Sequence, residues 1–347
     1  MTFGSKVNEW YQSKCKAAAP ESFPNTDWFL QMLKTNSMMQ HLFYPKWLIT
    51  CLMLAINLPA FSQNSPSESP PAAESIPQIY MLSGGTYESS PPYSDYATLH
   101  RYLPASQTLE AVDTIYTQSA QDAVIQGTAL FVAAQDSLVK YDITTQERLQ
   151  AVALSNIAAL GIQDSLLFVS RQDGISGAPS DSVFLKVLHA QDLSLVKNLE
   201  AVNDDAASIA FGRGKAWVAV NGGYASTTGG IAEILLSDFS VQYHDLDTLA
   251  GNIQNVFVQE DTVNYVCPTP YGESYGKIGR YMPLQDSLAV DSLEGALGSA
   301  AGMSGNALQV IFDNAVRNYS MTRQQLTDTL ASGEFTAAAA YSGFLVA

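Results

Sequence analysis

Residues 122–152 read DAVIQG, TALFVAAQD, SLVKYDITTQE and RLQAV, and this stretch decides the fold. Its four short apolar runs are separated by polar turns, which is the pattern of short antiparallel strands joined by tight connections. We name the four expected strands A, B, C and D in chain order. Together they form one four-stranded antiparallel unit.

Variants of this unit recur up to the C-terminus. Strand A returns as NIAALGI, ASIAFG, NVFVQE, AAGMSG and AAAAYSG, and strand B as LLFVSRQ, AWVAVN, VNYVC, LQVIFD and FLVA. A repeated four-stranded sheet predicts a β-propeller, and the many Ala and Gly residues of strand A suit the narrow axis where blades converge. We therefore predict an all-β propeller of four-stranded antiparallel blades over residues 77–347.

The number of blades is left between six and seven. IYMLSGG, ATLHRYLP and TLEAVDTI match strands B, C and D, so the first blade is expected to lack a strand A of its own. If AAAAYSG joins that blade, six blades close and FLVA is left over. If seven blades are intended, the last one lacks strands C and D, and the pattern is a seven-bladed one truncated at the C-terminus.

The residues before the repeats divide into three segments. Residues 38–62 have a weakly basic start, an apolar run and small residues at Ala60 and Ser62, which predicts a secretory signal peptide and a mature chain beginning near Gln63. Residues 1–37 are then an extension upstream of the true start, and residues 63–76, rich in Pro, Ser and Glu, a disordered linker. A lipoprotein with Cys51 as the acylated residue is the weaker alternative.

Charge and cysteine content exclude several classes of protein. The chain of 347 residues carries 17 Lys and Arg against 33 Asp and Glu, a net charge of −16, which disfavours nucleic-acid binding and favours neutral or cationic ligands. Of its three cysteines only Cys267 lies in the repeats, so neither a disulfide framework nor a zinc site can be built there. We expect Cys267 to be a small, partly buried strand residue.

The repeats from IYMLSGG onward resemble the YncE-like, surface-layer type of bacterial β-propeller. LFVAAQ with LVKYDITT, and LLFVSRQ with VFLKVLHAQDL, carry the pattern of that family. The resemblance implies a secreted or cell-surface protein, located in the periplasm, at the outer-membrane surface or outside the cell. Some members of the group capture cobalamin for a TonB-dependent outer-membrane transporter, and the resemblance implies that ligand and that partner as alternatives.

The strongest functional signal is a set of long loops between strands B and C. Four blades have them, with SGGTYESSPPYSD, QDGISGAPSDS, NGGYASTTGG and CPTPYGESYG, and all four fall on one face of a propeller. These loops carry six tyrosines that could bind a small molecule, a glycan or a protein, or could anchor the loops to the blades: Tyr87, Tyr93, Tyr96, Tyr224, Tyr271 and Tyr275.

Equivalent positions at the end of strand B form a second candidate group: Gln135, Arg171, Asn221, Cys267 and Asp313. If the register is kept, these side chains surround the mouth of the axial channel, where Arg171 is the single cation available for an anionic group. The alternative is that they cap the backbone of the loops.

Catalytic and metal sites are not predicted. The repeats contain only His100, His189 and His244, which fall in different blades and should not meet. The acidic pairs Asp204–Asp205 and Glu260–Asp261 have the look of solvated turn residues. We therefore expect a non-enzymatic binding propeller that needs no cofactor, with a lactonase-like enzyme and a purely structural surface protein as the alternatives.

Overall fold

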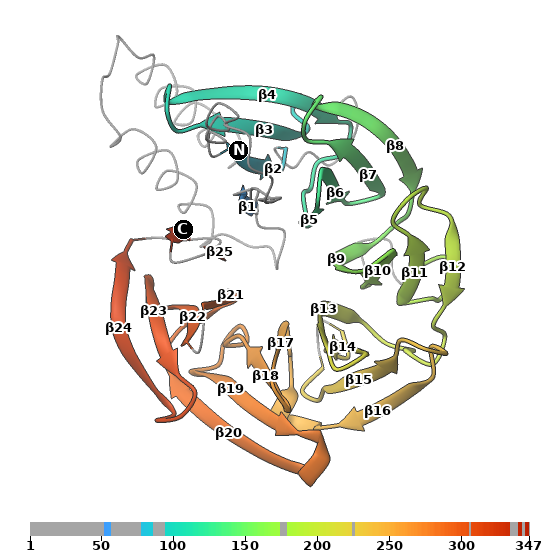
Figure 1. Ribbon diagram of the computed structural model, residues 1–347. Helices are drawn as coiled ribbons and strands as arrows, with labels where there is room; N and C mark the ends of the chain where they lie inside the picture. Colours follow the sequence, from blue (N-terminus) through green and yellow to red (C-terminus); the bar gives the residue numbers. More distant parts are fainter. Residues whose placement is uncertain are drawn as a thin grey trace, which may run out of the picture. The chain divides into compact units, whose positions relative to one another are not determined.

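The computed structural model describes residues 78–85, 94–173, 179–223, 226–304 and 307–333, together with the backbone of residues 52–56, 339–341 and 344–346. These residues form six antiparallel four-stranded sheets and one two-stranded sheet. Figure 1 shows the six sheets set around a common axis, each with its first strand innermost. The prediction of an all-β propeller of four-stranded blades is confirmed, with six such blades.

Each blade is a meander whose strands follow one another from the axis outward. In chain order the blades are β1–β4 (Leu52–Ile56, Gln78–Ser83, Ala97–Leu103, Thr108–Ile115), β5–β8 (Asp122–Gln126, Ala129–Ala134, Ser137–Asp142, Glu147–Ala153), β9–β12 (Ile157–Gln163, Leu166–Arg171, Leu185–His189, Leu195–Asn198), β13–β16 (Ala206–Gly212, Lys215–Val220, Gly230–Leu235, Val241–Asp245), β17–β20 (Asn255–Gln259, Thr262–Cys267, Tyr275–Met282, Ser287–Glu294) and β21–β24 (Leu297–Ser304, Ala307–Phe312, Ala315–Ser320, Gln325–Ser332).

The meander fixes which connections share a face. The links from the second to the third strand of a blade, and from its last strand to the next blade, lie at one end of the strands; we call this end the loop face. The links from the first to the second strand and from the third to the fourth lie at the other end, the turn face. Two short 3-10 helices, η2 (Asp247–Ala250) on the loop face and η3 (Pro283–Gln285) on the turn face, interrupt these links.

The first blade corrects one expectation. Its inner strand is β1, which pairs with β2 and places Leu54 opposite Tyr80. No strand A was predicted for this blade, because the apolar run LMLAI also matches the hydrophobic region of a signal peptide. Cleavage after Ser62 would remove β1, so the strand and the predicted cleavage are alternatives for the same residues.

The end of the repeats is a two-stranded sheet. β25 (Ala339–Tyr341) pairs with β26 (Phe344–Val346), and β25 approaches both β21 of the last blade and β1 of the first. The strands expected from AAAAYSG and FLVA are therefore present as a pair. They add to the six complete blades instead of supplying strand A of the first.

The apolar cores lie between the blades. Side chains alternate along each strand, so both faces of a blade are buried, and the five apolar clusters each combine residues of two neighbouring blades. At the axis the inner strands come so close that a Cβ atom on Gly161 would lie 2.8 Å from the side chain of Ile209. This close approach explains the small residues of the inner strands, as the sequence predicted.

Three of the five described seams between blades also carry a tyrosine hydrogen bond. Tyr141, Tyr281 and Tyr319 occupy the same position on the third strand of their blades, opposite the second residue of the strand before. Each hydroxyl reaches the outer strand of the preceding blade, at Asp113 Oδ2 (2.7 Å), His244 Nδ1 (2.8 Å) and Asp291 Oδ2 (3.0 Å). Burial and the neighbouring carboxylates raise the pKa of Tyr141 and Tyr319, so both remain donors.

The other two seams are apolar at the same place. Leu188 and Ile234 stand where the tyrosines would be, and they pack in the clusters that contain Val152 and Leu199 of the preceding blades. At this position of every described seam, a tyrosine hydroxyl thus meets a polar group, or an apolar side chain packs in an apolar cluster. This matching keeps buried hydroxyls satisfied, which avoids the cost of an unpaired polar group.

Candidate functional site

Of the four long loops predicted for the loop face, those of blades 3 and 5 show most clearly, in their described residues, how their side chains are used. Tyr87, Tyr93 and Tyr224 of the predicted site lie outside the described residues. The other predicted residues, Tyr96, Gln135, Arg171, Asn221, Tyr271, Tyr275 and Asp313, can be placed. They divide into side chains that hold the loops and side chains that face solvent.

The loop of blade 5 displays its tyrosines. The amide of Glu273 donates to the carbonyl of Pro270 (3.0 Å), which closes a turn with Tyr271 and Gly272 at its centre. Gly272 has φ of +84°, as a type II turn requires at that position. The Tyr271 side chain is 100% exposed and Tyr275 is 51% exposed. Tyr271 therefore does not anchor the loop to the blade.

Backbone and threonine contacts hold this loop instead. Thr269 donates from its amide to the Leu297 carbonyl (3.0 Å) and from its hydroxyl to the Gly295 carbonyl (2.8 Å). The Leu297 amide donates back to the Thr269 hydroxyl (2.9 Å). The loop is thus tied to the start of blade 6, and it can present aromatic side chains at a low cost in conformational entropy.

The loop of blade 3 uses its cation internally. Arg171 is 1% exposed, and its guanidinium donates to Asp181 Oδ1 (2.5 Å), the Val183 carbonyl (2.7 Å) and the Ser155 carbonyl (2.8 Å). Lys186 lies on the other oxygen of Asp181, at 2.6 Å. Burial would raise the pKa of Asp181, but hydrogen bonds from Lys186 and Arg171 outweigh it and hold that pKa below its usual range. Arg171 therefore binds its own loop and is not free for an anionic ligand.

Two of the four remaining second-strand ends, Asn221 and Asp313, cap loop backbones with their side chains. Asn221 Oδ1 accepts from the Gly223 amide (3.1 Å), and Asp313 Oδ1 accepts from the Ala296 amide (2.8 Å). Gln135 lies in a tight turn with φ of +48°, and its backbone amide donates to the side-chain oxygen of Gln121. Cys267 is 2% exposed, and burial raises the pKa of its thiol to about 12, so it is inert. The capping alternative describes Asn221 and Asp313 correctly.

Tyr96 and the acidic residues Asp205 and Asp261 make contacts within the fold. Tyr96 packs edge-on against Tyr116, with ring centroids 5.1 Å apart, and so contacts the link that follows β4. Asp205 is buried and accepts from the Asp173 amide (2.7 Å), which joins the loops of blades 3 and 4, and Asp261 forms an ion pair with Arg213. Describing these acidic residues as merely solvated was wrong for Asp205.

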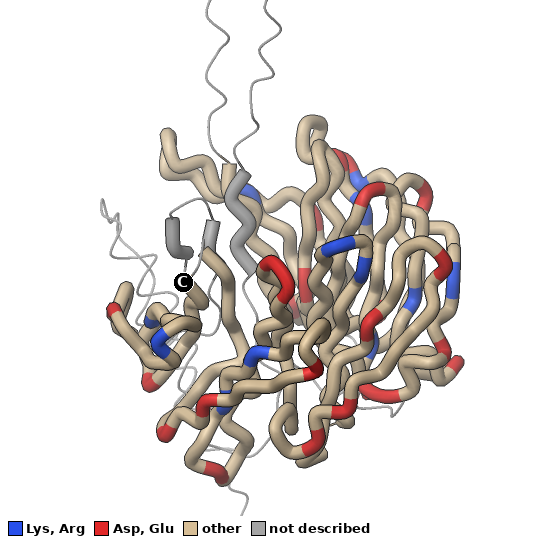
Figure 2. The backbone as a smooth tube through the Cα atoms, turned by 60° about the horizontal axis from the view of Figure 1, so that its bottom comes forward, with Lys and Arg blue, Asp and Glu red and all other residues tan. Residues whose placement is uncertain are grey.

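The exposed charges of the loop face are mainly acidic. Asp173, Asp204, Asp245, Asp247 and Glu273 are exposed there. Two cations near this face are held by contacts within the fold: Arg171 pairs with Asp181, and Lys277 donates to the Thr248 carbonyl (2.5 Å). Figure 2 shows acidic residues distributed over the blades and more frequent than basic ones. The face is therefore suited to neutral or cationic ligands.

Asp122 is a titratable group at the loop-face end of an inner strand, and it was not among the predicted site residues. Its Oδ2 accepts from the Leu160 amide of the next blade (2.7 Å), and its Oδ1 accepts from the Ala123 amide (2.8 Å). Burial raises its pKa to about 7, and the two amides only partly oppose that shift. The carboxyl thus changes charge near neutral pH while it links two blades.

The histidines do not converge. His100 is on β3, His189 ends β11 and His244 is on β16, in three different blades, as predicted. His244 lies in a chain of contacts, 3.0 Å from Glu233 Oε2 and 2.8 Å from the Tyr281 hydroxyl, but Tyr281 is 4% exposed. Within the described part of the chain, no three His, Cys, Asp or Glu side chains gather as a metal site would need, and no helix is long and apolar enough to cross a membrane.

Comparison with known proteins supports the fold alone. Neither a protein-family model nor a curated protein sequence matches the chain. Similar solved structures include hydrazine synthase from Kuenenia stuttgartiensis (TM-score 0.56, 11% identity, covering 70% of this chain and 83% of that one). The WD40 repeats of RRP9 (TM-score 0.56, 11% identity, 76% and 80% covered) and the computationally designed Ika8 protein (TM-score 0.53, 15% identity, 77% and 76% covered) are also similar. The chain is thus a β-propeller, and at these identities its neighbours say nothing more of its function.

Proposed function

We propose that this propeller is a non-enzymatic binding module that takes a neutral or cationic ligand or partner on its loop face. The observation that carries the proposal is the loop of blade 5. It is held by the Thr269 contacts and by a closed turn, yet it leaves Tyr271 wholly exposed and Tyr275 half exposed. Rigidly presented, exposed tyrosines are typical of recognition surfaces, because they give a large contact area for little lost entropy.

The surrounding charge narrows the class of ligand. Exposed carboxylates, Glu273 among them, flank the tyrosines. The guanidinium of Arg171 is already hydrogen-bonded to Asp181 within its own loop. An anionic ligand would meet repulsion, whereas a glycan, a neutral ring system or a cationic segment of a partner would not. A tyrosine ring also attracts cations directly.

A thermal-shift screen tests this proposal. The probes are cyanocobalamin, which the sequence resemblance suggests, and a panel of neutral and amino-sugar glycans. A ligand that binds the folded state raises the melting temperature by mass action. We expect a shift with at least one probe, lost in the Tyr271→Ala, Tyr275→Ala double variant and kept in Leu284→Ala.

Leu284 is the matched control because it is 76% exposed and lies in η3, on the turn face of the same blade. A shift that survives in the double variant, or that disappears equally in the control, would exclude the blade 5 loop as the binding surface.

We also propose that the protein is exported, supported by the layout of residues 38–62. N-terminal sequencing of chains recovered outside the cytoplasm tests this. A start near Gln63 is expected; exported chains that begin upstream of Leu52 would show that β1 is retained and that the predicted cleavage is wrong.

A further inference from the structure

The turn face carries a pocket of about 350 Å³ at the seam between blades 2 and 3, away from the loops of the proposed function. Blade 2 contributes the end of β5, the start of β6 and Lys140 of β7, while blade 3 contributes two turns. The volume is at the lower end of the range of small-molecule sites. The lining residues are Gln126, Ala129, Phe131, Lys140, Asp164, Ser165, Ala190 and Gln191.

Lys140 is a fixed cation in this pocket. Its Nζ donates to the Ala190 carbonyl (2.9 Å) and the Gln191 carbonyl (2.7 Å), and it lies 5.6 Å from the centre of the Phe131 ring. An ammonium group has three N–H donors, so two are used and one is left. Lys140 forms no ion pair with any described carboxylate, unlike Lys186 and Lys215.

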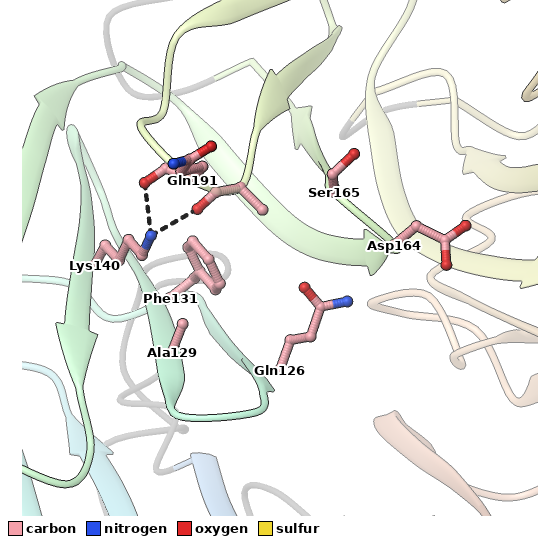
Figure 3. Close-up of a pocket in the computed structure, with 8 residues that line it drawn as sticks. Gln126, Ala129, Phe131, Lys140, Asp164, Ser165 and Gln191 are labelled. Carbon is pink, nitrogen blue, oxygen red and sulfur yellow. Dashed lines mark hydrogen bonds between the residues drawn. The ribbon is translucent and has the colours of Figure 1, made fainter.

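The other polar groups suit hydroxyls. Figure 3 shows Lys140 and Gln191 on one side of the pocket and Gln126, Ser165 and Asp164 on the other, with the Asp164 carboxylate pointing away from Lys140. Amides and a hydroxyl both donate and accept, as sugar hydroxyls require. Ala129 and Ala190 add small apolar surfaces, whereas Phe131 is 1% exposed and offers none.

We propose that this pocket binds a small hydroxylated monocarboxylate of the sugar-acid class, with the carboxylate on the remaining N–H of Lys140. The hydroxyls of the ligand then contact Gln126, Ser165 and Gln191. A neutral sugar leaves the lysine donor unused, and a polyanion is disfavoured by Asp164 and by the net charge of −16. A single carboxylate on an otherwise neutral ligand uses the lysine donor and avoids the repulsion that a polyanion would meet.

Calorimetric titration with D-glucuronate tests the site, with D-glucose as the uncharged counterpart. We expect saturable binding of glucuronate and at least about tenfold weaker binding of glucose, because a charge-assisted hydrogen bond is lost. Lys140→Met should weaken glucuronate binding by a similar factor. Lys197→Met, which removes an exposed lysine of β12 in the same blade 3, should leave it unchanged.

Gln191→Ala is a second test that should not disturb folding. It keeps the backbone carbonyl that accepts from Lys140 and removes only the side-chain amide. It should weaken binding a few-fold with an unchanged melting temperature. Absence of saturable glucuronate binding, equal affinity for glucose, or wild-type affinity in folded Lys140→Met or in Gln191→Ala would each overturn the proposal. The Tyr271→Ala, Tyr275→Ala variant should bind glucuronate with wild-type affinity. The proposal for this pocket and the proposal for the loop face are therefore tested independently.

Discussion

The enlarged loops of blades 3 and 5 leave the second strand at equivalent positions and use their side chains in opposite ways. In blade 3 the position is Arg171, and the loop folds back over it through Asp181, Val183 and Lys186. In blade 5 the position is the inert Cys267, and the loop is held by Thr269 while its tyrosines face solvent. One loop is held by buried charge; the other is held by its backbone and displays its side chains.

The difference shows that a polar residue at the mouth of a propeller does not by itself indicate a ligand. Arg171 has enough donors for an anion, but its own chain satisfies them. The residues left for recognition are those whose loop is stable without them. Substitutions at Arg171 and at the displayed tyrosines test this distinction directly, and those at Asp122 and Tyr319 compare it with the contacts between blades.

The largest expected effect is on Arg171. Arg171→Met removes every hydrogen bond of the guanidinium and leaves the Ser155 and Val183 carbonyls without their donor. We expect a loss of about 3 kcal/mol in the free energy of unfolding, as for other buried charge networks that lose one partner. Urea unfolding of the wild-type and variant proteins measures this difference in the free energy of unfolding. A loss below about 0.5 kcal/mol, the range of ordinary surface changes, would show that the buried charge does not hold the loop.

Asp122 should make stability depend on pH near neutrality. Its pKa of about 7 is raised above the ordinary value, so the folded state keeps a proton that the unfolded chain loses between about pH 4 and pH 7. Stability from this group is therefore present at low pH and is lost as pH rises through about 7. Relative to Asp122→Asn, the wild-type protein should gain on the order of 2 kcal/mol between pH 8 and pH 5.

Urea unfolding of both proteins at the two pH values gives this difference. Parallel pH profiles would mean that the carboxyl titrates at its ordinary pKa and is not desolvated at the seam.

The tyrosines of the seams should matter less. Tyr319→Phe removes one hydroxyl that donates to Asp291, and we expect a loss of about 1–2 kcal/mol because the acceptor is charged. Leu188→Met, at the same position in an apolar seam, serves as the control and should cost less than about 1.5 kcal/mol. Thermal and urea unfolding compare the two. If the phenylalanine variant matches the wild-type protein, the hydrogen bond does not stabilise the seam.

The smallest expected effect on stability is at the displayed tyrosines. Tyr271→Ala and Tyr275→Ala should each change the free energy of unfolding by less than about 0.5 kcal/mol, because neither side chain is buried. Differential scanning calorimetry checks this. A larger loss would mean that these rings anchor the loop after all.

Much of the fold could be predicted because the repeats are local. Apolar runs and turn dipeptides located all four strands of blade 2 and the first and second strands of blades 3 to 6, and the position of His100, His189 and His244 in separate blades followed from the strand count. β1 was missed because LMLAI fits a strand and a signal peptide equally well. The local sequence pattern does not distinguish a strand from the hydrophobic region of a signal peptide.

The site was harder to predict because it depends on contacts between distant residues. The partners of Arg171 come from two separate places in the chain, Ser155 and the loop that contains Asp181 and Val183, and the Tyr319–Asp291 pair joins two blades. One signal was available: a tyrosine recurs at one position of the third strand in several repeats, which suggests a shared partner. The exposure of Tyr271 had a signal too, in the turn sequence PYGE.

Hydrogen–deuterium exchange tests the central claim, that ligand binding occurs on the loop face. The protein is compared with and without the strongest ligand of the thermal-shift screen. The account predicts slower exchange at residues 268–275 and 221–223, with no change at residues 126–131 and 190–191 of the turn face. Protection confined to the turn face, or absent from residues 268–275 at saturating ligand, would contradict it.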